Sequence, residues 1–154
     1  MMPTEYIVSS LPALAFGAPA PISWETFMAT AGGRFDENAF DGIEVVLRNA
    51  IAEARGGGEK SRRPTNVCSL YWYNRMLACF QEKDTLKRDE LVDRVWWEAA
   101  DELTDASAPL GSGALATYAI RLKIAIKRSK ISKDAGMAAF DRLAEESETA
   151  SKTN

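Results

Sequence analysis

Apolar positions recur with helical spacing along most of the chain. In residues 36–54 they come at three- and four-residue steps, while charged residues fall largely elsewhere; the apolar positions are Phe40, Ile43, Leu47, Ile51 and Ala54. This spacing places the apolar side chains on one face of an α-helix. It predicts an amphipathic helix that Asp36 caps and that ends at Gly56-Gly57-Gly58.

Three or four more helices are predicted after this one. Residues 66–81 are apolar or aromatic on nearly every side, which is typical of a central helix, and we interpret Leu70-Tyr71-Trp72-Tyr73 as core packing in preference to a base-stacking platform. Asp84 or Thr85 begins a helix with an inward stripe; the stripe comprises Leu91, Val92, Val95, Trp96, Ala99 and Leu103. Glycine and proline at 109–113 precede a fifth helix over about 114–131, and Ser132 is expected to cap a last one over 133–146.

The N-terminal region has a different pattern. Tyr6-Ile7-Val8 is too short to separate an edge strand from a helical turn, and we favour the strand. Prolines at 12, 19 and 21 disfavour helix in the residues before them, so residues 11–22 are expected to form an extended arm. Ser23 is expected to cap a short helix through Thr30.

These elements predict an all-α fold: a single-domain helical bundle of about four long and two short helices with an extended N-terminal arm. A chain of 154 residues suits one domain. We expect residues 1–22 to pack as the arm on the body, residues 23–146 to form the helical domain with a mobile loop near 56–65, and residues 147–154 to be a disordered tail.

Composition and charge narrow the function classes. The net charge of −3 gives the whole chain no electrostatic attraction to nucleic acid or anionic lipid. No window approaches the length of a membrane span. Cys68 and Cys79 are expected to be reduced core residues, which favours a cytoplasmic location, or a peripheral one at the cytoplasmic face of the membrane through protein partners.

The residues that usually carry catalysis are missing from the sequence. It contains no histidine and no phosphate-binding glycine loop, and its carboxylate pairs, such as Asp89-Glu90 and Asp101-Glu102, fall in surface-like registers. Two cysteines on one helix cannot complete a tetrahedral metal site. We therefore predict a protein that is not an enzyme, with no catalytic residue, no metal and no cofactor.

Two features are candidates for binding a partner. Consecutive residues on a helix cannot both face one core, so Trp97 is turned away if Trp96 points inward. Trp97 could then anchor an interface or pack under the arm. Positive charge also gathers on the predicted fifth helix, either as a solvated face or as a surface for an acidic protein; the residues are Arg121, Lys123, Lys127, Arg128 and Lys130.

The opening residues 6–27, YIVSSLPALAFGAPAPISWETF, and the segments ATYAIRLKI (116–124) and Ala135-Gly136-Met137 resemble a family of uncharacterised bacterial proteins. Genes of that family typically lie within operons for the vacuolar/archaeal-type (V/A-type) rotary ATPase. The resemblance implies a helical protein without an active site, similar in role to the three-lobed socket protein that joins the rotor shaft of these ATPases to the membrane ring. This chain is much shorter than that socket protein and would supply only part of such a structure.

The leading hypothesis is therefore a non-catalytic accessory or structural component of a bacterial V/A-type ATPase that acts by protein docking. The alternative is a free-standing helical protein-interaction module. A third hypothesis is a nucleic-acid binder that uses the basic fifth helix.

Overall fold

The computed structural model describes residues 2–58, 62–64 and 69–152, and side chains as far as residue 148. Six α-helices and one 3-10 helix follow one another in this part of the chain: α1 (Thr4–Ser10), α2 (Trp24–Ala31), α3 (Asp41–Ala54), α4 (Leu70–Cys79), α5 (Thr85–Ala99), η2 (Ala100–Leu103) and α6 (Ser112–Lys152). The described residues include no strand, so the prediction of an all-α fold is confirmed.

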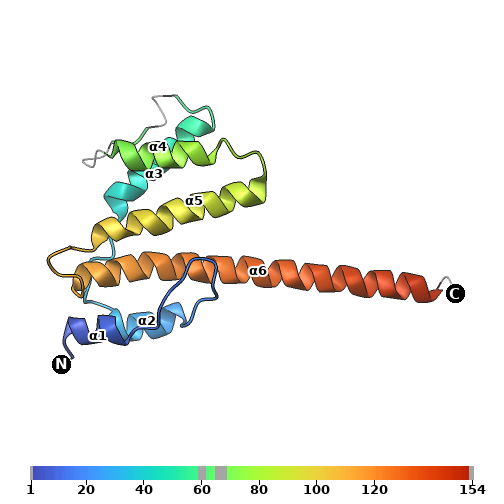
Figure 1. The fold of residues 1–154 in the computed structure, drawn as a ribbon, viewed down its shortest axis with the longest axis horizontal. Helices are drawn as coiled ribbons and strands as arrows, with labels where there is room; N and C mark the ends of the chain where they lie inside the picture. The colour runs from blue at the N-terminus through green and yellow to red at the C-terminus, as the bar shows by residue number, and fades with distance from the viewer. Residues whose placement is uncertain (1, 59–61, 65–68, 153–154) are drawn as a thin grey trace.

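The helices form layers on either side of α6 (Figure 1). Helices α1 and α2 lie along one side of it, and α5 followed by the α3–α4 pair lies on the other. The C-terminal half of α6 continues beyond the body as a single rod. Four long and two short helices are present, as predicted, although the first and the last of them differ from those that the sequence predicts.

Two hydrophobic cores hold these layers together. The larger core joins α3, α4, α5 and η2 around the fully buried Leu47, Met76 and Ala99. The smaller core joins α1, α2 and α6 around Phe27 and Leu122, neither of which exposes any surface. Helix α6 contacts both sets of helices, which makes it the common support of the fold.

The N-terminal segment differs from the prediction in its first element. Residues 4–10 are the helix α1, not a strand, and its first turn is closed by the carbonyl of Pro3, which accepts from the amides of Tyr6 and Ile7. Ile7 is 2% exposed because α1 lies against α6. Burial of this apolar side chain decides between two local conformations that the sequence leaves nearly equal.

Residues 11–22 connect α1 to α2 without helix or strand. Leu11, Leu14 and Ile22 pack against the core around Phe27. Ser23 is the predicted cap of α2, and its Oγ accepts from the amide of Thr26 at 3.1 Å.

Two predictions about α3 and α4 need correction. Helix α3 begins at Asp41, not after Asp36, because residues 37–40 form turns in which the Asp36 carboxylate accepts from the amide of Asn38. Helix α4 lies in the outer layer, so Leu70 and Tyr71 are 71% and 61% exposed, and only part of the predicted aromatic core cluster is buried. The start of the predicted helix at 66–68, Cys68 and part of the loop near 56–65 lie outside the described residues.

The prediction of two helices after Pro109 is wrong. Helix α6 runs without a break from Ser112 to Lys152, through Ser132 and across residues 147–152, where a disordered tail was predicted. Serine caps a helix only where the chain before it is not helical, and no glycine–proline pair interrupts residues 126–135. The helix therefore continues, and its 41 residues give a length of about 60 Å.

Candidate functional site

The basic residues predicted for a partner surface lie on the part of α6 that packs against the body, where most of them have partners within the chain. Lys127 Nζ lies 2.9 Å from one carboxylate oxygen of Asp93 on α5, and Arg128 donates to the other oxygen at 3.0 Å. Asp93 is 5% exposed. This buried carboxylate ties α5 to α6 and offsets the charge of two predicted partner-binding residues.

Arg121 lies at the α5–α6 contact. Its Nε donates to the backbone carbonyl of Trp97 at 3.0 Å, its guanidinium lies 5.4 Å from the Trp97 ring, and it pairs with Asp101 at 3.3 Å. The positive charge of Arg121 is thus directed at α5 and η2 instead of an outside partner.

Trp97 packs under the N-terminal arm, one of the two positions that the sequence left open. The ring of Phe16 meets it edge to face at 5.6 Å. Phe16 is itself held by the guanidinium groups of Arg94 and Arg128, at 4.4 Å and 5.1 Å from its ring centre. This cluster of rings and cations fastens the arm to α5 and α6.

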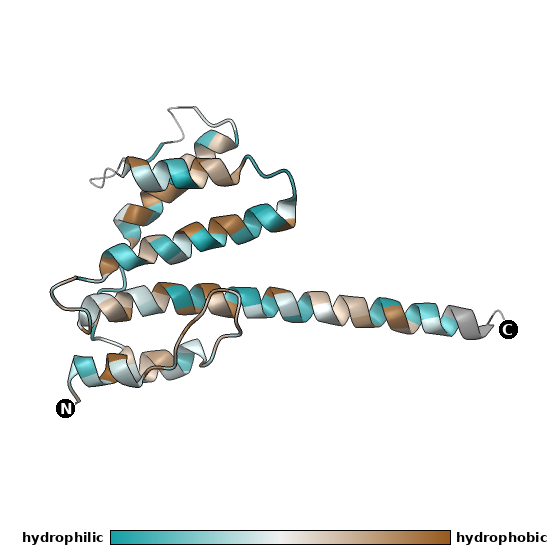
Figure 2. Cartoon of the chain, in the orientation of Figure 1, coloured by the Kyte–Doolittle hydropathy of each residue, from teal (hydrophilic) through white to brown (hydrophobic). Residues whose placement is uncertain are grey.

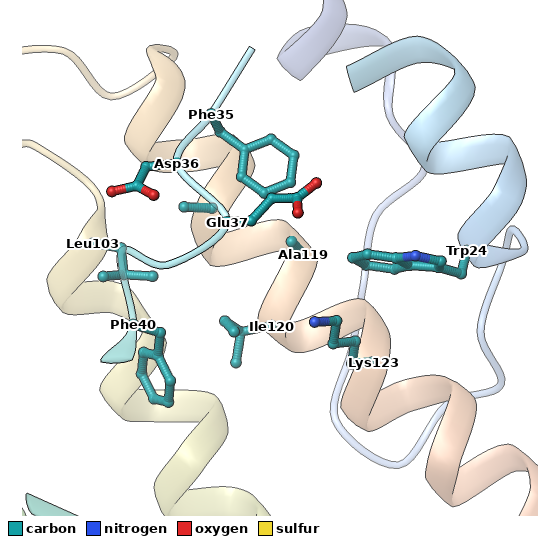
Figure 3. Close-up of a pocket in the computed structure, with 10 residues that line it drawn as sticks. Trp24, Phe35, Asp36, Glu37, Phe40, Leu103, Ala119, Ile120 and Lys123 are labelled. Atoms are coloured by element: carbon teal, nitrogen blue, oxygen red, sulfur yellow. The ribbon is translucent and has the colours of Figure 1, made fainter. Parts of the chain in front are cut away.

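Lys123 lies at the edge of a small cavity between α2, the turn before α3, and α6 (Figure 3). Its Nζ is 4.8 Å from the centre of the Trp24 ring, and Asp36 and Glu37 line the same cavity. The cavity volume of about 40 Å³ suits one or two water molecules and is far below that of a ligand pocket. Lys130, the last of the predicted residues, is exposed where α6 leaves the body.

Beyond this point α6 presents a surface that was not among the predicted sites. We call residues 131–148 the projecting segment; every one of these residues is exposed. Met137, Phe140 and Leu143 are 57%, 69% and 65% exposed. Their three-residue steps are visible in the sequence, but the predicted cap at Ser132 implied a separate helix folded back on the body.

The described part of the chain offers little for bond-making chemistry. It holds no group of three or more cysteine, aspartate or glutamate side chains placed to bind a metal ion. Cys79 is buried, and desolvation raises the pKa of its thiol, which disfavours the nucleophilic thiolate. The buried carboxylate of Asp93 already accepts from two cations.

Comparisons with protein-family models, with curated proteins and with solved structures found no match to this chain. Within residues 2–58, 62–64 and 69–152, no helix combines the length and the apolar character that a membrane crossing requires.

Proposed function

We propose that this protein acts by docking to other proteins, without catalysis, and that the projecting segment of α6 is its docking element. The observation that carries this proposal is a helical rod of about 27 Å that leaves the body with Met137, Phe140 and Leu143 exposed. Large exposed apolar side chains grouped on one face mark protein interaction sites. Lys130, exposed at the base of the rod, belongs to the same surface.

The partner class that we propose is a V/A-type ATPase, for which the chain would be an accessory or structural component. This part of the proposal rests on the sequence resemblance given above. A helical body with a projecting rod is a shape suited to bridging the parts of an assembly. The alternative is an interaction module unrelated to the ATPase, which has the same docking element and different partners.

Purification of the tagged chain from its native cell tests the proposal. We expect wild-type protein, crosslinked at low salt, to recover ATPase proteins, and Phe140→Asp to lose them. Ile131→Asp is the matched control, because Ile131 is 50% exposed on the opposite face of the same helix. Recovery of other proteins in the same Phe140-dependent way would favour the alternative, and recovery of none would refute docking.

Nucleic-acid binding remains the third candidate. The partners of Arg121, Lys127 and Arg128 within the chain reduce the charge left for phosphates. Phosphate contacts give binding that weakens steeply with salt, so absence of binding at about 50 mM salt would remove this candidate.

A further inference from the structure

One face of α6 is covered along its first half by the N-terminal elements. Leu115, Ala119 and Leu122 lie on this face and are at most 4% exposed, because α1, α2 and the arm pack on them. The arm reaches as far as Ser129, whose Oγ accepts from the amide of Ala20 at 3.0 Å. The covering layer therefore lies over the part of α6 that precedes the projecting segment.

The same face continues beyond the covering layer with apolar side chains exposed. At about 100° per residue, Met137, Phe140 and Leu143 fall within the arc of about 120° that also holds Leu115 and Leu122. Figure 2 shows apolar positions among hydrophilic ones along this segment. We call Met137, Phe140, Leu143 and Ala144 the apolar stripe. An unsupported helix of this length is marginal in water, so contact with the stripe would stabilise it.

Charge along α6 is segregated by position. Residues 121–133 hold six basic residues and no acidic one. Residues 134–148 hold five acidic residues and a single basic one, Arg142. The rod is thus basic at its base and acidic toward its tip, and it complements a second copy of itself laid in the opposite direction.

We infer that the apolar stripe binds the apolar stripe of a second copy of this chain, in an antiparallel helix pair. This inference rests on the proposed function and names the first partner of the docking element. Two-fold symmetry makes the contact self-complementary, so each copy contributes the same side chains. The two bodies lie at opposite ends of the paired rods.

The register of the pair follows from the stripe. When Met137 of one copy faces Phe140 of the other, paired residue numbers sum to 277. Glu145 then lies within one residue of Lys133 in the second copy, and Glu148 within one residue of Lys130. Opposite charges therefore meet on both sides of the stripe, whereas a parallel pair would place base against base and acid against acid.

The molar mass of the purified full-length chain tests self-association. We expect the mass to rise with concentration from 16.9 kDa toward twice that value. Phe140→Asp should weaken self-association by at least about 100-fold, because a two-fold pair loses the buried ring twice. Ile131→Asp should leave it unchanged. A wild-type chain that stays monomeric up to about 1 mM overturns the inference.

A charge exchange tests the direction of the pair. Glu145→Lys combined with Glu148→Lys should abolish self-association, and so should Lys130→Glu combined with Lys133→Glu. An equimolar mixture of these two variants should form a heterodimer, because each altered end then meets its opposite charge. Failure of the mixture to associate, while each variant keeps the wild-type helix content, overturns the antiparallel arrangement.

Spin-label distances give a third test. In a Cys68→Ser background, a label at Ala138→Cys should lie close to its symmetry mate, because 138 faces 139 in the predicted register. A label at Glu146→Cys should be about 22 Å from its mate along the axis, since 146 faces 131. Short distances at both positions would indicate a parallel pair and overturn the inference.

The two proposals fail separately. If the chain is monomeric but loses its native partners on Phe140→Asp, docking stands and self-pairing falls. If the chain dimerises as described but recovers no other protein, self-pairing stands and docking to other proteins falls.

Discussion

Replacing Asp93 by asparagine is expected to destabilise the fold by about 1.5–2.5 kcal/mol. Asparagine keeps the shape of aspartate and removes the charge, so the change isolates the electrostatic contribution of the clamp between α5 and α6. The structure places the Asp93 carboxylate, 7% exposed, between Lys127 at 2.9 Å and Arg128 at 3.0 Å.

The magnitude follows from what the two cations lose. Removing one partner of a fully buried ion pair costs about 3–5 kcal/mol. Here the side chains of Lys127 and Arg128 are 57% and 26% exposed, so water already solvates part of their charge. Asparagine also retains one hydrogen-bond acceptor. We therefore reduce the range by about half.

Urea unfolding followed by far-ultraviolet circular dichroism at neutral pH gives the free energy of unfolding directly. The midpoint should fall while the slope stays constant, because the surface exposed on unfolding is unchanged. The expected fall in melting temperature is about 4–8 °C for a chain of this size.

Glu90→Gln is the matched control on the same helix. Glu90 and Arg94 form a pair at 3.9 Å in which both side chains are about half exposed. Such pairs contribute at most about 0.5 kcal/mol. If Asp93→Asn changes the stability as little as Glu90→Gln does, the clamp between α5 and α6 is not a significant source of stability.

Three further changes test the rest of the fold. Gly113→Ala should destabilise by at least about 2 kcal/mol, because a Cβ there would overlap the carbonyl oxygen of Leu103, whereas Gly136→Ala meets open space and should raise helix content; equal melting temperatures would contradict this. Phe16→Ala should release the arm from Trp97, measured as faster proteolysis within residues 11–22 at unchanged helix content. Cys79 should react with iodoacetamide at mildly alkaline pH only upon unfolding, because burial raises the thiol pKa; this favours the neutral folded form, so the contribution of Cys79 to stability is lost as pH rises through that pKa.

Features fixed by neighbouring residues could be predicted from the sequence. The caps at Ser23 and Asp84 depend on one side chain and the amides two or three residues later, and both are confirmed. The stripe of α3 depends on periodicity within one helix, and its central member Leu47 is fully buried. Local chemistry determines these features, so local reasoning suffices.

Features that depend on distant partners could not be predicted in this way. Asp93 resembles any other surface carboxylate until Lys127 and Arg128, more than thirty positions away, are placed beside it. Trp97 is ambiguous until Phe16 is placed over it. The continuity of α6 at Ser132 was missed because a serine that can cap a helix can also lie inside one.

The central place of α6 also sets an order on biosynthesis. Residues 4–31 emerge from the ribosome early, yet the surface they cover belongs to residues 115–129; the bond from Ala20 to Ser129 spans 109 positions. Helices α3, α4 and α5 can meet one another during translation, whereas α1 and α2 must wait for α6. The N-terminal segment of a nascent chain therefore stays open to chaperones and proteases until the last quarter of the polypeptide has been made.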